Sequence, residues 1–196
     1  MAYNLNDKLV IAISSRALFD LEEENQIFEK DGLDAYYKYQ LENEDKSLKK
    51  GTGYRLVENI LKINSFFSSD ERQVEVIILS KNNAATSLRI TNAINDLKLD
   101  IIRSAWTSGT NISNYLKAFK VDLFLSADDN DVLNAIENGV AAAKILPSNE
   151  NIHNSSNNQV RIAFDGDAVL FSEESELIYK NNGLDAFIEH EKLNKD

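Results

Sequence analysis

Two carboxylates stand one residue apart in the segment VRIAFDGDAVLF, residues 160–171. The apolar residues before Asp165 predict a buried strand, and Gly166 allows a sharp turn between Asp165 and Asp167. In a parallel sheet, ligands bind beyond the carboxyl ends of the strands, which is where this pair would lie. Two like charges this close are costly unless a cation neutralises them or one carboxyl group takes a proton. A hard divalent cation such as Mg2+, which prefers carboxylate and carbonyl oxygens, would satisfy the pair.

This arrangement is suited to phosphoryl transfer. With a divalent cation present, Asp165 could attack phosphorus and Asp167 could pass a proton to and from the leaving oxygen. An Asp-Gly-Asp triplet also occurs in ordinary turns and in fragments of calcium-binding loops. The apolar strand before the triplet and the AVLF segment after it favour a site at a strand end over an exposed loop.

The elements that must position such a site alternate between strand and helix. We therefore predict an α/β fold, a three-layer Rossmann-like parallel sheet with helices on both faces. Strands are expected at residues 8–14, 73–80, 99–106, 121–127 and 140–146. Helices are expected at 20–44 with a break at Gly32, and at 51–67, 83–96, 112–120 and 128–139.

The sequence contains an internal repeat with an offset of 151 residues. The block GLDA occurs at 32–35 and again at 183–186, and from this anchor the alignment runs without a gap from residue 8 onward to the C-terminus. Ser14 aligns with Asp165, and Arg16 aligns with Asp167. Only the second copy therefore carries the carboxylate pair.

The repeat predicts the domain organisation. Residues 1–146 are expected to form a degenerate first domain, residues 147–158 are a polar linker rich in Asn and Ser, and residues 159–196 begin a second, catalytic domain. The first copy needs most of 8–146 to complete its sheet. We therefore expect about a hundred further residues after Asp196.

Several blocks resemble known phosphatases. FDGDAVLF resembles the first motif of the haloacid dehalogenase (HAD) superfamily. This segment, together with AISSRALFDLEEENQIFEKDGLDAYYKYQLENE, YLKAF and LFLSADDNDVLNAIENGVAAAKI, is similar to the cytosolic 5'-nucleotidase type I family. The resemblance implies a cytoplasmic, Mg2+-dependent enzyme that hydrolyses nucleoside 5'-monophosphates, AMP foremost, through an aspartyl-phosphate intermediate. It implies that Asp165 is the nucleophile and Asp167 the general acid/base. The Asp165 carboxylate and the Asp167 backbone carbonyl would bind the metal.

The HAD resemblance also implies three further motifs: a Ser or Thr, a Lys, and an acidic pair. For the second copy these are expected after Asp196, so the 196 residues alone are expected to hydrolyse AMP poorly. The first copy is expected to be catalytically dead, with relics at the matching places. These relics are Ser14, Arg16, Ser80, Lys117 and Ser126-Ala127.

Other polar and aromatic residues have simpler interpretations. Lys117 and the TSGTN loop (107–111) could bind a phosphate, but a surface lysine and a capping loop are the more common explanation. The acids that open the helix at 128–139 are expected to stabilise its N-terminus rather than bind a metal. The tyrosines at 36, 37 and 39 are expected to serve packing more than nucleobase stacking.

Composition restricts the partners. The formal net charge is −11 and the sequence pI is about 4.7, which disfavours nucleic acids and anionic membranes. The absence of Cys excludes disulfides and thiolate chemistry. The sequence is compatible with association into a homo-oligomer. Two other functions also remain: a non-catalytic nucleotide-binding or assembly module built on the first copy, and a HAD phosphatase for another small phosphoester.

Overall fold

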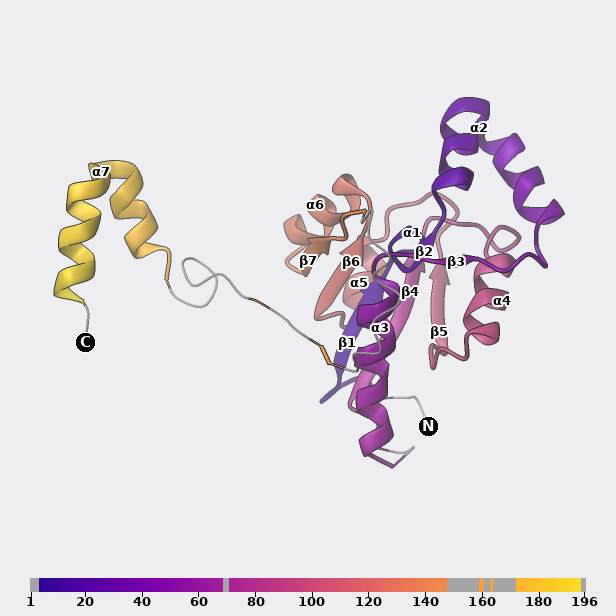
Figure 1. Cartoon of the computed structure of the whole chain (residues 1–196), viewed down its shortest axis with the longest axis horizontal. Helices are drawn as coiled ribbons and strands as arrows, with labels where there is room; N and C mark the ends of the chain where they lie inside the picture. The colour runs from indigo at the N-terminus through magenta and orange to yellow at the C-terminus, as the bar shows by residue number, and fades with distance from the viewer. Residues whose placement is uncertain (1–3, 69–70, 148–158, 161–162, 164–171, 195–196) are drawn as a thin grey trace. The chain divides into compact units, whose positions relative to one another are not determined.

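The structure is a computed structural model that describes residues 4–68, 71–147, 159–160, 163 and 172–194. It divides into two compact units, Met1–Asn158 and Gln159–Asp196 (Figure 1). The larger unit holds a complete sheet, and the smaller one holds a long bent helix.

The larger unit is built on a five-stranded sheet in the order β5-β4-β1-β6-β7, in which all neighbouring strands are parallel. Residues of β1 pair with β4 on one side and with β6 on the other. The strand bounds are β1 Leu9–Ile13, β4 Val74–Ser80, β5 Arg103–Trp106, β6 Leu123–Ser126 and β7 Ala141–Lys144. The expected α/β fold with a parallel Rossmann-like sheet is therefore confirmed.

Four helices connect these strands and cover the sheet on both faces. The chain moves outward from β1 to β5 through α3 and α4, and then in the opposite direction to β7 through α5 and α6. Because such crossovers are right-handed, the two pairs of helices lie on opposite faces. The bounds are α3 Tyr54–Leu61, continued by the 3-10 helix η1 Lys62–Phe66, then α4 Leu88–Asp96, α5 Ser113–Ala118 and α6 Asp129–Glu137.

Alternation along the strands explains the core. On one face, alternate residues of β1 and β4 pack against α5 and α6. This cluster includes Ala12, Ile77, Leu116 and Ala135, each of which is fully buried.

A small antiparallel ladder, which the sequence did not predict, follows β1. The short helix α1 (Ser15–Leu18) leads into β2 (Phe19–Asp20), which pairs with β3 (Lys49–Lys50). A Cβ at Gly51 would lie 2.7 Å from the backbone carbonyl carbon of Phe19, so only glycine fits at this close approach. The GTG segment therefore serves backbone packing.

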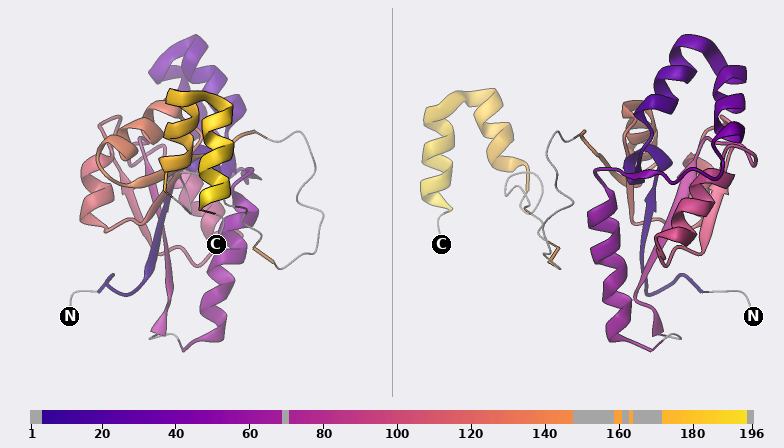
Figure 2. Two further views of the ribbon diagram at one scale, coloured as in Figure 1. Left: turned by 90° about the vertical axis from the view of Figure 1, so that its left-hand side faces the viewer. Right: turned by 45° about the vertical axis from the view of Figure 1, so that its right-hand side comes forward.

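Between β2 and β3 stands α2 (Glu22–Glu42), which is bent into a hairpin at Gly32 as predicted. Gly32 has φ 84° and ψ −177°, a conformation that is almost restricted to glycine. The hairpin projects beyond the carboxyl edge of the sheet (Figure 2). Phe28 and Tyr36 meet edge to face across the bend, with ring centroids 5.9 Å apart at 78°.

The smaller unit repeats this hairpin. Its helix α7 (Glu174–Leu193) bends at Gly183, with φ 83° and ψ −177°. Tyr179 and Phe187 meet edge to face at 6.1 Å and 77°. Each of these residues lies 151 positions after its counterpart in α2, so the offset of the sequence repeat is also the offset of the two hairpins.

In the part of the chain that the structure describes, no helix is both long enough and apolar enough to cross a membrane.

Candidate functional site

A cavity of about 770 Å³ lies at the carboxyl edge of the sheet in the larger unit. It is enclosed by the segments that follow β1, β4 and β6, and by one face of the α2 hairpin. The crossovers change direction between β1 and β6, and at such a switch point α/β sheets bind their ligands. The volume is in the range of small-molecule sites.

Hydroxyl and amide groups from three segments join into one network in this cavity. The Ser15 and Ser80 hydroxyl oxygens are 2.9 Å apart, and Ser80 donates to Asn82 Oδ1 at 2.7 Å. The Asn82 amide donates to the Tyr36 hydroxyl at 2.7 Å and to Thr86 Oγ1 at 3.2 Å. The network therefore ties the ends of β1 and β4 to the α2 hairpin.

The charged groups of the cavity are mostly paired. Lys81 Nζ lies 2.6 Å from Asp131 Oδ1, and Arg16 lies 3.8 Å from Glu22. Asp128 caps α6 by accepting a hydrogen bond from the Asp131 backbone N–H at 3.0 Å. The interpretation of these acids as helix-terminus partners is correct for Asp128, while Asp131 also neutralises Lys81.

A buried ion pair holds the hairpin against α4. Arg89 pairs with Glu24, and both side chains are buried. The same guanidinium donates to Gln40 Oε1 at 3.4 Å and to the Lys46 backbone carbonyl at 3.0 Å. The wall that α2 contributes to the cavity is therefore fixed by a residue from another element.

The strand end of the first copy has no carboxylate at the positions that align with Asp165 and Asp167. The Ser14 hydroxyl accepts a hydrogen bond from the Ala17 backbone N–H at 3.3 Å and so caps α1. Arg16 brings a positive charge to the position that aligns with Asp167. Among the described residues, no group of three or more His, Asp or Glu could hold a metal ion.

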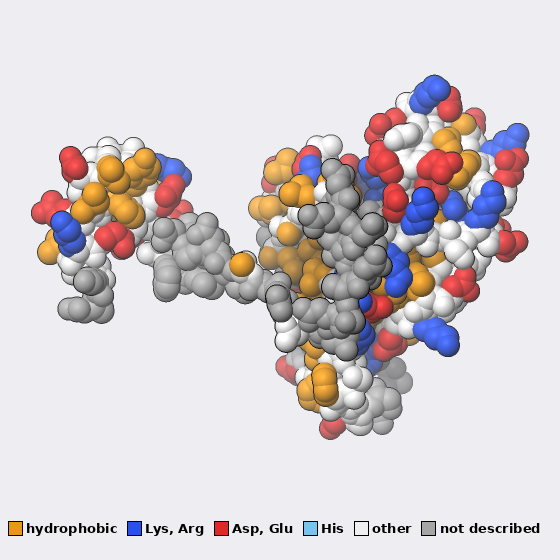
Figure 3. Space-filling model, viewed as in Figure 1, with side chains coloured by type: hydrophobic (Ala, Val, Ile, Leu, Met, Phe, Trp, Pro, Cys, Tyr) orange, Lys and Arg blue, Asp and Glu red, His pale blue; other side chains and the backbone are white. Residues whose placement is uncertain are grey.

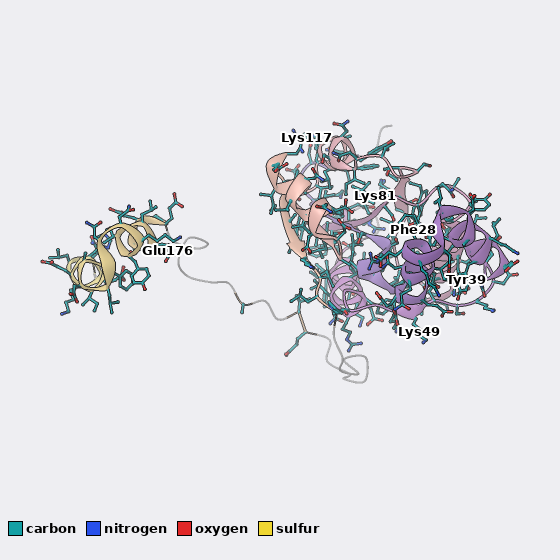
Figure 4. All side chains as sticks on the ribbon, turned by 90° about the horizontal axis from the view of Figure 1, so that it is seen from above. Phe28, Tyr39, Lys49, Lys81, Lys117 and Glu176 are labelled. Atoms are coloured by element: carbon teal, nitrogen blue, oxygen red, sulfur yellow. The ribbon has the colours of Figure 1, made fainter. Side chains whose placement is uncertain are left out.

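The structure locates some of the predicted residues and not others. Asp165 and Asp167 lie outside the described residues. Ser80 and Ser126 line the cavity, whereas Lys117 does not. Lys117 is exposed on α5 and lies at the periphery in the view of Figure 4, away from Lys81. A surface lysine is thus the correct interpretation of Lys117.

Sequence reasoning missed the role of the hairpin and of Lys81. Tyr36 packs against Phe28, as expected, and in addition its hydroxyl faces Asn82 and its side chain lines the cavity. Phe28 also lines it. Their positions in the sequence could have indicated this role, because Lys81 and Asn82 directly follow a strand that ends at the same edge of the sheet as β1.

Comparison with known proteins assigns the chain to a family. The sequence model of the 5'-nucleotidase family matches residues 1–196. Human cytosolic 5'-nucleotidase 1B is 35% identical to this chain over 189 residues, which cover 94% of the chain and 31% of the human protein. The chain thus spans about a third of the length of this relative. The match over its whole length shows that the chain belongs to the 5'-nucleotidase family.

Proposed function

We propose that this protein hydrolyses nucleoside 5'-monophosphates, AMP in preference, to nucleoside and phosphate. Membership of the 5'-nucleotidase family supports the reaction class, and the name of the human relative supports a cytosolic location. The assignment of the reaction to Asp165 and Asp167 is supported by their positions in the repeat. Asp165 and Asp167 align with Ser14 and Arg16, which line a cavity at the carboxyl end of a central strand.

In the proposed reaction, Asp165 attacks phosphorus as the bond to the ribose 5' oxygen breaks. Asp167 donates a proton to that oxygen, so the nucleoside leaves as a neutral alcohol. Water then attacks the aspartyl phosphate while Asp167 takes the proton back, and inorganic phosphate is released. The free Asp165 carboxylate is restored at the end of the cycle.

Mg2+ is the metal that we propose for this reaction. The Asp165 carboxylate and the Asp167 backbone carbonyl are hard oxygen donors of the kind that Mg2+ prefers. The matching position in the first copy does not fit a cation, because Ser14 is engaged as a helix cap and Arg16 is positive. When bound, the ion would neutralise charge on the transferring phosphoryl group.

Phosphate release from AMP by the purified native protein tests the proposal. We expect steady turnover with Mg2+, loss of turnover with EDTA, and recovery when Mg2+ is added back. A larger kcat/KM for AMP than for GMP, CMP or sugar phosphates would support the stated preference. Turnover of sugar phosphates alone would favour a HAD phosphatase with another substrate.

The cavity of the larger unit favours a second function, non-catalytic nucleotide binding by the first copy. This cavity is lined by the Lys81 ammonium, the hydroxyl network and the aromatic rings of Phe28 and Tyr36. Equilibrium dialysis of AMP against the Asp165→Asn protein tests this idea. Two sites per chain, reduced to one by Lys81→Met, are expected if the first copy binds nucleotide. One site that Lys81→Met does not change would contradict it.

A further inference from the structure

We propose that one face of α7, formed by Tyr179, Lys180, Leu184 and Phe187, is the substrate-binding wall of the second copy. The two aromatic rings contact the nucleobase, and Lys180 contacts the phosphate. This inference rests on the proposed hydrolysis of nucleoside monophosphates and assigns residues to recognition of the substrate.

The first copy shows which face of the hairpin forms a cavity wall. Phe28, Glu29, Leu33 and Tyr36 of α2 all line the cavity of the larger unit. Their counterparts at the offset of 151 residues are Tyr179, Lys180, Leu184 and Phe187. The bend has the same backbone angles in α2 and α7, and the pairs Phe28–Tyr36 and Tyr179–Phe187 have nearly the same ring geometry.

Matching residues of α2 and α7 also have similar side-chain exposure. Phe28 is 47% exposed and Tyr179 is 49% exposed, while Leu33 is 62% exposed and Leu184 is 58% exposed. Figure 3 shows hydrophobic side chains gathered on the surface of the α7 hairpin. In α2 the exposed apolar groups face a cavity, which explains why they are not packed against other elements.

The aromatic pair is suited to a planar base. Tyr179 and Phe187 meet edge to face, which fixes both rings and leaves a ring face available for stacking. Every nucleobase has a π face, and stacking on aromatic side chains is a common mode of base recognition.

One position of the wall is negatively charged in the first copy and positively charged in the second, and a positive charge favours an anionic substrate. Glu29 in α2 accepts a hydrogen bond from Asn25 at 2.8 Å. The counterpart of Glu29 is Lys180, whose ammonium pairs at the surface with Glu176 at 3.0 Å. The second copy thus has a cation where the first has a carboxylate. A phosphate dianion can displace such a surface pair.

Kinetics of the native full-length protein with two substrates test the proposal. AMP and ribose 5-phosphate share the phosphate and differ in the base. We expect Tyr179→Ala to lower kcat/KM for AMP about tenfold and to leave ribose 5-phosphate unchanged. Tyr179→Phe should restore AMP turnover, since α2 carries Phe at this position. Lys180→Glu should raise KM for both substrates roughly tenfold or more, with kcat largely kept.

A matched control makes the same charge change elsewhere on α7. Lys192 is exposed, and its counterpart Leu41 does not line the first cavity, so Lys192→Glu should leave both KM values unchanged. Equal effects of Lys180→Glu and Lys192→Glu would overturn the role of Lys180. Equal losses on both substrates, or no loss, for Tyr179→Ala would overturn the base-contacting role. If the native protein hydrolyses no nucleoside monophosphate, the proposed function itself fails.

Discussion

The α2 and α7 hairpins share their bend and their aromatic pair, while the residue that anchors α2 is replaced in α7. In α2, the Glu23 carboxylate faces Tyr39 across the bend and contributes to raising the pKa of its hydroxyl. In α7, the counterparts are His190 and Glu174, whose Nε2 and Oε1 atoms are 3.8 Å apart. Together with the shared glycine bend and aromatic pair, this third pair joins the two arms of each hairpin at matching positions.

The residue that anchors α2 has a different kind of counterpart in α7. Glu24 of α2 is buried against Arg89. Its counterpart in α7 is Ser175, which donates to Glu191 at 2.5 Å within the same helix. No residue described in α7 is buried. The comparison teaches that the bend and the aromatic pair recur where the anchoring residue Glu24 is replaced by Ser175.

The largest expected effect comes from breaking the anchor of α2. Arg89→Met leaves the Glu24 carboxylate buried without its cation, so we expect a loss of about 3–5 kcal/mol in the free energy of unfolding. Ser175→Ala, at the counterpart of Glu24, should change it by less than about 0.5 kcal/mol. Urea unfolding followed by fluorescence of Trp106, the only tryptophan, measures the Arg89→Met loss in the larger unit, and hydrogen exchange of the α7 amides measures the effect of Ser175→Ala. Equal losses would contradict the difference in anchoring.

The next largest effect concerns the bends. Gly32→Ala and Gly183→Ala place a Cβ at φ +84° and +83°, where neither meets another atom within 4 Å. Backbone strain alone should therefore cost about 1–3 kcal/mol in each hairpin. Hydrogen exchange of the α2 and α7 amides should show similar loss of protection in the two variants. A large loss in one hairpin only would show that the bends are not equivalent.

A smaller effect is expected at the aromatic pair. Tyr36→Phe removes the hydroxyl that accepts a hydrogen bond from Asn82, and should cost about 0.5–1.5 kcal/mol. Phe187→Tyr, the reverse change in α7, should leave stability unchanged within about 0.5 kcal/mol. The same urea titration serves for Tyr36→Phe, and circular dichroism of the helices for Phe187→Tyr. If Tyr36→Phe left the free energy of unfolding unchanged, the hydrogen-bond network around Asn82 would not contribute to holding the hairpin in place.

The smallest effect is a pH dependence at Tyr39 of α2. Burial, together with the Glu23 hydrogen bond and charge, raises the pKa of Tyr39 above its ordinary value of 10.0. Folding therefore favours the protonated phenol. The contribution of the protonated Tyr39 phenol to the free energy of unfolding is complete below pH 10. It is lost as the pH rises through the higher folded-state pKa. Tyr39→Phe should flatten the decline of stability above pH 10, as measured by urea unfolding at several pH values, and an unchanged decline would contradict this assignment.

The sequence predicted the large elements well, for a physical reason. Strand β1 is a continuous apolar run, and β4 is apolar apart from Glu75 and its last residue, Ser80. The break at Gly32 has the residue that its dihedral angles require. The β2–β3 ladder was missed because two-residue strands carry no periodicity. Arg89 and Glu24 were missed because their pairing joins residues 65 positions apart in the chain, which no local pattern reveals.

The central claim is that the second copy performs the chemistry and the first does not. Steady-state phosphate release from AMP with Mg2+, measured for Asp165→Asn and Ser14→Ala in the native protein, tests it most directly. Circular dichroism confirms folding of both. We predict that Asp165→Asn abolishes turnover, because an amide cannot attack phosphorus, and that Ser14→Ala leaves it largely intact. Equal losses in the two variants would contradict the account and place the first copy in the reaction.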